Sequence, residues 1–138
     1  MADKKLEKLK YPIGTFEAPK VIDDALILTW IEDIEHFPTA IAELTKNLTV
    51  QQLHWPYRPN GWNIKQVVHH CADSHMNSII RFKLALTEDS PTIRPYYEDR
   101  WATLVDGNDN NLENTLLLLK GLHAKLGILL RSITKEQM

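Results

Sequence analysis

The chain has 138 residues, of which 43% are hydrophobic and 25% charged, as is typical of one globular domain with its own core. Its net charge of −2 provides no basic face for a nucleic acid, and the single cysteine, Cys71, excludes an intrachain disulfide and a cysteine-rich zinc site. The charged N-terminus predicts no secretory signal and no apolar run approaches the ~18 residues that span a bilayer, so we expect a cytoplasmic protein without membrane or nucleic-acid partners.

The first predicted helix follows a short lead-in. Glycine is scarce and apolar residues recur every three or four positions, which predicts an all-α protein. Residues 1–19 form the lead-in, in which Tyr11–Pro19 is not helical. A helix is expected over about Lys20–Asn47, with a kink or a break at Pro38 because proline lacks the backbone donor. Its apolar stripe comprises Ile22, Leu26, Trp30, Ile34, Phe37, Ile41, Leu44 and Leu48.

The second predicted helix carries the most informative part of the chain. It follows a turn-rich segment, Val50–Gly61, that ends in Asn-Gly. Asn63 is the expected N-cap, and Gln66 can complete a capping box with it, so the helix should run from there to about Thr87.

A third helix is expected near the C-terminal end. Before it come a loop with two prolines, a short helical turn near Glu98–Leu104 and a polar linker at Asp106–Asn111. The helix should span about Leu112–Ile133. Its inward face comprises Leu112, Thr115, Leu116, Leu119, Leu122, Leu126, Leu129 and Leu130. Three long helices pack poorly without a fourth element, and a capping box at residues 134–137 marks where a further helix could begin.

Three of the six histidines, His69, His70 and His75, fall within seven residues of the second helix. Imidazole is the commonest protein metal ligand. At about 100° per residue, His75 lies in the apolar arc and His69 on the opposite, solvent side. His70 lies on the rim of the apolar arc, at the head of a polar stripe. That stripe continues through Ser74, Asn77 and Arg81. A polar stripe at the edge of a helical core is where a bundle can open a pocket.

Ordinary structural roles stand beside these functional ones. His69 can be a solvated residue, His70 a boundary residue and His75 a core histidine bonded to a neighbour. Cys71 fits a small buried hydrophobe. The remaining histidines, His36, His54 and His123, gain nothing from their spacing.

Several segments together resemble a known family. The run Tyr57–Asn77, with Arg81–Leu84, Ile93–Tyr96, Trp101-Ala102 and the early Tyr11–Gly14, is similar to the YfiT-like branch of the DinB superfamily. The resemblance extends from about residue 11 to the end of the chain. It implies a four-helix bundle of unusual connectivity and a homodimer that acts on a small molecule.

The resemblance also implies a function. Family members are metal-dependent hydrolases, and relatives transfer low-molecular-weight thiols. Three histidines hold a divalent metal, zinc or nickel, and the one on the second helix aligns with His70. Such a site has an open position and lowers the pKa of bound water to roughly 7. Ser74, His75, Asn77, Arg81 and Tyr96 are the expected pocket-lining residues, without a role as general base for any of them.

The chain departs from the family pattern in one large way. The family's fourth helix, with its His-x-x-x-His pair, has no counterpart in these 138 residues, so two of the three ligands are missing. Smaller departures are Asn63, Cys71 and Tyr97, where the family usually has Thr or Ser, Leu and an acid. Two hypotheses therefore remain: a metal-dependent enzyme, and a non-catalytic bundle that dimerises or binds a small molecule.

Overall fold

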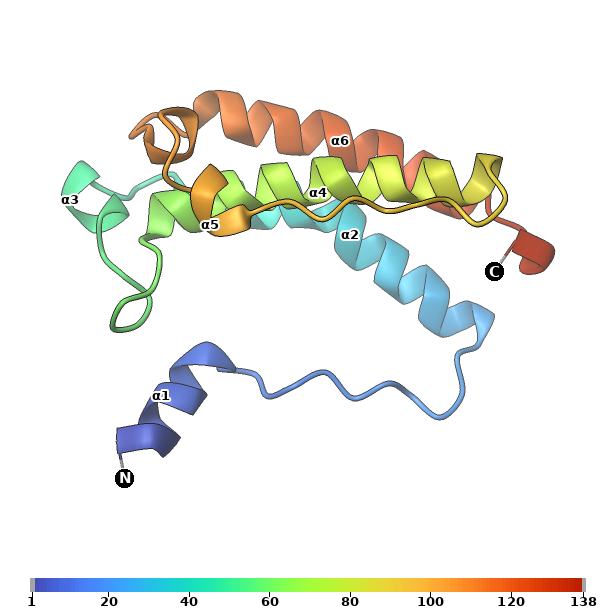
Figure 1. Ribbon diagram of the computed structural model, residues 1–138, viewed down its shortest axis with the longest axis horizontal. Helices are drawn as coiled ribbons and strands as arrows, with labels where there is room; N and C mark the ends of the chain where they lie inside the picture. Colours follow the sequence, from blue (N-terminus) through green and yellow to red (C-terminus); the bar gives the residue numbers. More distant parts are fainter. Residues whose placement is uncertain (1, 138) are drawn as a thin grey trace.

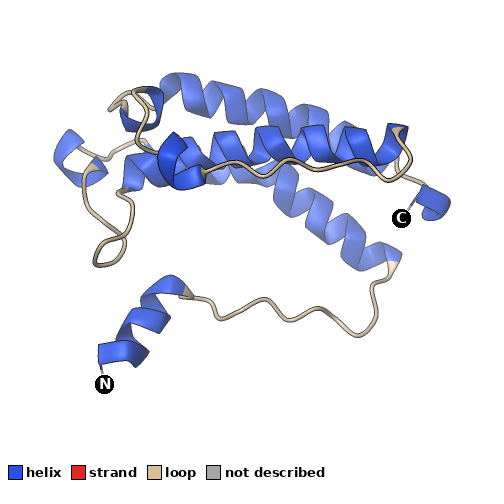
Figure 2. Ribbon diagram, viewed as in Figure 1, coloured by secondary structure: helices blue, strands red, loops and turns tan. Residues whose placement is uncertain are grey.

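Three long helices lie side by side in the computed structural model, which describes residues 2–137 (Figure 1). They are α2 (Asp24–Thr45), α4 (Ile64–Thr87) and α6 (Glu113–Arg131). Helix α6 packs against both α2 and α4. Every regular element among the described residues is helical, apart from one isolated antiparallel bridge, Pro56–Asn63 (Figure 2). The predicted all-α class is confirmed, and the described residues add no fourth long helix to these three.

Two groups of buried apolar side chains hold the three helices together. Ile31, Ile79, Leu126 and Leu130 join α2, α4 and α6 at one end. Leu53, Val68 and Leu112 form the second group, at the end where α4 begins. The predicted inward face of α6 is correct, and Leu119 is fully buried in it. Burial of each such leucine stabilises the fold by about 1.5–3 kcal/mol.

Helix α2 differs from its prediction at its start and in its apolar stripe. It begins at Asp24, since the Asp23 carboxylate caps it by accepting the Leu26 backbone N–H at 2.8 Å. Of the kink or break predicted at Pro38, the break does not occur: the helix continues through this buried residue, and the kink stays a prediction. Two residues of the predicted stripe are wrong: Ile22 lies before the helix, and Leu44 is 73% exposed, whereas another face of α2 packs against α6.

Short helices occupy segments predicted as loops. Helix α3 (Val50–Leu53) forms because Thr49 and Gln52 make a capping box that the sequence reading missed. Within the predicted linker, the 3-10 turn η1 (Asp106–Asn108) packs against α4. The short turn expected after the proline loop is α5 (Glu98–Trp101), as predicted, and a final turn η2 spans Lys135–Gln137.

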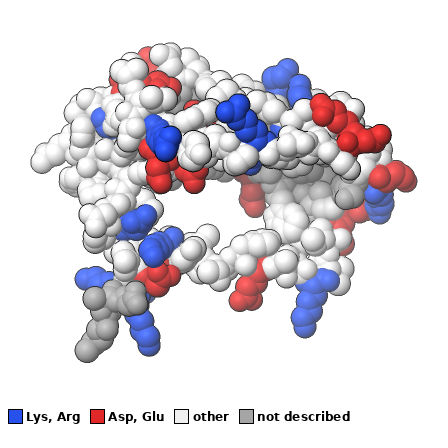
Figure 3. Space-filling view, in the orientation of Figure 1, with Lys and Arg blue, Asp and Glu red and all other residues white. Residues whose placement is uncertain are grey.

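The N-terminal segment stands apart from the packed helices (Figure 1). Helix α1 (Ala2–Lys10), which was not predicted, precedes a non-helical stretch that was. Residues 11–24 are all exposed, and Ile13 and Phe16 are 99% and 82% exposed. The space-filling view shows an opening between this segment and the bundle, with positive and negative side chains interspersed on the visible face (Figure 3).

None of the helices within residues 2–137 combines the length and the apolar character needed to cross a bilayer.

Candidate functional site

Helix α4 positions the candidate site, and its first turn sets the phase of the helix. Asn63 Oδ1 accepts the Gln66 backbone N–H at 3.0 Å, and Gln66 Oε1 accepts the Asn63 N–H at 3.1 Å. The predicted capping box is therefore confirmed. Gln66 Nε2 also donates to the Ala102 carbonyl at 2.9 Å, which ties the start of α4 to the segment after α5.

The prediction that His69 faces solvent is wrong. The ring is only 6% exposed and lies between two groups from the far side of the sequence. Nε2 is 3.0 Å from the Asp109 carbonyl, and Nδ1 is 2.7 Å from Thr115 Oγ1. A carbonyl only accepts, so Nε2 carries the proton and, in the neutral ring, Nδ1 accepts the Thr115 hydroxyl. Both ring nitrogens are used, and His69 is excluded as a metal ligand.

Lys65, one turn earlier on the same face, is buried for the same reason. Its ammonium donates to the Asn108 carbonyl at 2.6 Å and to Asn110 Oδ1 at 3.0 Å. The face predicted to meet solvent is thus covered by η1 and the residues that lead into α6. Buried donors at these positions find backbone and amide acceptors rather than water.

His70 has a different environment. Its ring is half-buried and lies 4.6 Å from the Trp62 ring, centroid to centroid, at an interplanar angle of 57°. In the part of the chain that the structure describes, no hydrogen bond engages either of its nitrogens. Of the two adjacent histidines, His70 is the one whose lone pair no other described residue engages.

Asp73 shares this neighbourhood. Burial, and then the nearby Asp106 carboxylate, raise the pKa of Asp73, whereas His70 and His69 act in the opposite direction. Burial alone raises the pKa of the Cys71 thiol, as expected for a small apolar residue rather than a reactive thiolate.

His75 meets His123, a contact that the sequence analysis missed. Their nitrogens, His75 Nδ1 and His123 Nε2, are 2.7 Å apart, although the residues are 48 positions apart in sequence. His123 Nδ1 donates to the Ile34 carbonyl of α2, so the neutral His123 ring accepts the His75 Nδ1–H. Phe37 lies against both rings. Leu119 and Leu126 lie one turn before and after His123 on the buried face of α6, and this spacing in the sequence could have predicted that His123 points inward.

The histidine pair has an electrostatic consequence. Burial, with smaller contributions from His123 and His70, lowers the pKa of His75 to about 4 from its usual 6.5. Near neutral pH the ring is therefore uncharged, with its proton on Nδ1 and the Nε2 lone pair left over.

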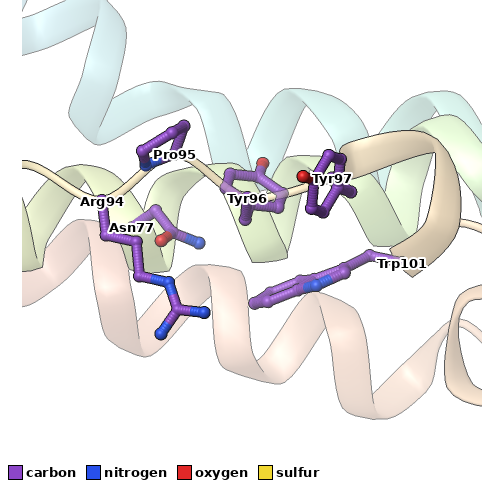
Figure 4. A pocket seen from close by; sticks show the side chains of 6 residues that line it. All are labelled: Asn77, Arg94, Pro95, Tyr96, Tyr97 and Trp101. Atoms are coloured by element: carbon purple, nitrogen blue, oxygen red, sulfur yellow. The ribbon is translucent and has the colours of Figure 1, made fainter.

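A pocket of about 660 Å³ opens beside the polar stripe of α4. Its lining residues are Asn77, Arg94, Pro95, Tyr96, Tyr97 and Trp101 (Figure 4). Two predicted residues, Asn77 and Tyr96, line it. Burial raises the pKa of Tyr96, and a hydrogen-bonding interaction with Ser74 and the charge of Arg81 oppose that shift. Ser74 and Arg81 thus lie near the tyrosine, and His75 is turned toward His123.

The described residues do not make up a complete metal site. Within residues 2–137, no group of three or more His, Cys, Asp or Glu side chains is placed to hold an ion. The donor set around His70 therefore falls short of the roughly three protein ligands that a catalytic metal requires.

Comparison with known proteins gives consistent results. The sequence model of the DinB superfamily matches residues 33–138. Proteins of Bacillus cereus (strain AH820) and Bacillus thuringiensis subsp. konkukian (strain 97-27), each named "Putative metal-dependent hydrolase", are 46% identical over 133 residues, or 96% of this chain and 76% of theirs.

A solved structure is similar over almost the whole chain. YfiT from Bacillus subtilis, described as "a probable metal-dependent hydrolase with an unusual four-helix bundle topology", aligns with a TM-score of 0.90 and 44% identity. The alignment covers 94% of this chain and 74% of YfiT. The resemblance inferred from the sequence motifs is confirmed.

Proposed function

Because this chain belongs to the DinB superfamily, we propose that it acts as a metal-dependent hydrolase in which His70 is one ligand of a divalent metal. One observation carries the choice of residue. His69 has both ring nitrogens bonded to Asp109 and Thr115, whereas the half-buried His70 has none bonded within the described residues.

The other ligands are proposed to lie outside residues 2–137 or on a second subunit, since one imidazole does not hold a catalytic metal. The metal is proposed to be zinc or nickel, both of which imidazole suits. Since the described residues do not complete the site, we derive no catalytic step from it. Thiol transfer is the competing reaction, because a position that binds water also binds a thiolate.

Ser74, Asn77, Arg81 and Tyr96 are proposed to surround a small-molecule substrate. Asn77 and Tyr96 line the pocket, and Ser74 and Arg81 adjoin Tyr96. For His75 we propose a role in holding α4 against α6 and α2, through its bond to His123.

A cytoplasmic homodimer is also proposed. The free Cys71 thiol suits a reducing compartment. An apolar groove of about 540 Å³, between α2 and the start of α4, offers a surface for a second subunit. Its lining includes Ile41, the exposed Leu44, Trp62 and Val67.

Metal analysis of the purified protein tests the function. Where the protein includes the other proposed metal ligands, we expect about one zinc or nickel ion per chain. The His70→Ala variant should lose this metal. His54→Ala is the matched control, because His54 is exposed and bonded to Asn110. Unchanged metal in His70→Ala refutes the assignment.

A metal-free wild-type protein supports the second candidate, a non-catalytic bundle that dimerises or binds a small molecule. The observation in favour of that candidate is the lack of a three-ligand cluster within residues 2–137.

A further inference from the structure

The pocket beside α4 contains one charged lining residue, Arg94, and its guanidinium has no partner among the described residues. No ion pair or hydrogen bond of that part of the chain involves it. Two other arginines, by contrast, have partners: Arg131 pairs with Glu35 at 2.6 Å, and Arg100 lies 4.4 Å from the centre of the Tyr97 ring. An arginine left over in a pocket is a candidate for an external anion.

Aromatic rings form the wall of the same pocket. The Tyr96 and Trp101 rings are 4.6 Å apart, centroid to centroid, at 46° to one another. Figure 4 shows the Arg94 guanidinium and the Trp101 indole extending toward one another from opposite ends, beneath Asn77 and Tyr96. The pocket therefore combines two aromatic rings with a cation at one end, an arrangement able to bind the ring and the charge of an aromatic acid.

Asn77 adds a polar group of fixed orientation. Its Nδ2 donates to the Asp73 carbonyl at 2.8 Å, which leaves Oδ1 as the group able to accept a bond from a ligand. The acidic neighbours of Tyr96, Asp73 and Glu98, do not line the pocket, so the charge of the lining is positive.

We propose that this pocket binds a small, flat organic carboxylate, with the carboxylate on Arg94 and the apolar body against Trp101 and Tyr96. One guanidinium matches one carboxylate in charge and as a bidentate pair. Asn77 follows His70 by seven residues, which places it about 10 Å along the same face of α4. Resting on the proposed function, this placement makes the carboxylate a recognition group and puts the bond to be cleaved near His70, toward the start of α4.

The experiment measures binding of 2-naphthoate and of its uncharged analogue, 2-naphthamide, to EDTA-treated protein by calorimetry. We expect naphthoate to bind about tenfold more tightly, since the ring is shared and only the charge differs. Arg94→Ala should remove that tenfold preference and leave naphthamide binding unchanged. Arg94→Lys should keep part of it, because the charge remains without the planar fork. Trp101→Phe should weaken both probes.

Arg58→Ala is the matched control, because Arg58 lies over the Tyr57 ring and bonds to its hydroxyl, away from the pocket lining. It should bind both probes like the wild type. Three results would each overturn the proposal. They are equal affinity for the two probes, naphthoate binding that survives Arg94→Ala, and no binding of naphthoate at concentrations up to about 10 mM. The proposed function fails separately, because its own test is the metal content of His70→Ala. Any of these three results, together with loss of metal in His70→Ala, overturns the carboxylate proposal alone and leaves His70 as a ligand.

Discussion

Acid should destabilise this protein in a way that depends on His75. The pKa of His75 is lowered from 6.5 to about 4 in the folded protein, mainly by burial. Between these two values the unfolded chain binds more protons than the folded one, so stability falls as the pH drops through this window. The full shift corresponds to at most about 3 kcal/mol. Because the ring is only half-buried, water screens part of that, and we expect a loss of about 1–2 kcal/mol.

Urea denaturation at pH 7.0 and 4.5, roughly the two ends of this window, measures the effect in the wild type and in His75→Gln. Glutamine keeps an N–H that can donate to His123 Nε2 but does not titrate. Other groups, including Asp73, titrate in both proteins, so the difference between the two isolates His75. We expect the wild type to lose about 1–2 kcal/mol more than the variant. His54→Gln, at an exposed histidine, should behave like the wild type. An equal loss in the wild type and His75→Gln refutes the reasoning.

Three further outcomes are expected. His69→Ala leaves the Thr115 hydroxyl and the Asp109 carbonyl without their buried partner, so the free energy of unfolding in urea titrations should fall by about 1–3 kcal/mol. Bound metal, measured in parallel, should stay at the wild-type level. Loss of metal would contradict the conclusion that His70, and not His69, is the metal ligand. Asn63→Ala removes the N-cap of α4 and should lower stability by about 1 kcal/mol, whereas the conservative Asn63→Ser should be nearly neutral; equal Tm values for the two variants count against the capping box. Leu119→Ala opens a cavity at a fully buried position and should lower the free energy of unfolding by about 2–5 kcal/mol, whereas Leu117→Ala, at an exposed position, should lower it by less than about 1 kcal/mol. Similar losses in the two variants would disprove the packing of α6.

Interactions within one or two turns of chain were readable from the sequence. The capping box of Asn63 and Gln66 spans three residues, so the start of α4 and the phase of its polar stripe could be predicted without knowledge of any other helix. The inward face of α6 follows from the same helical period. The box of Thr49 and Gln52 at α3 is equally local and was overlooked among the turn signals around it. Family membership also came from contiguous motifs, and the relatives bear it out.

What separates His69 from His70 lies far along the chain. His69 is buried because Asp109 and Thr115 reach it from 40 and 46 residues away, and no pattern around position 69 encodes that contact. His75 and His123 each looked like a single histidine on an apolar face, and only the packing of α4 against α6 makes them a pair. The role proposed for Arg94 likewise depends on Trp101 of α5 and Asn77 of α4, which line the same pocket. The sequence alone determined where α4 begins and which face of α6 is apolar, because those depend on neighbouring residues. The tertiary structure decided which polar groups are satisfied, because that depends on partners from other helices.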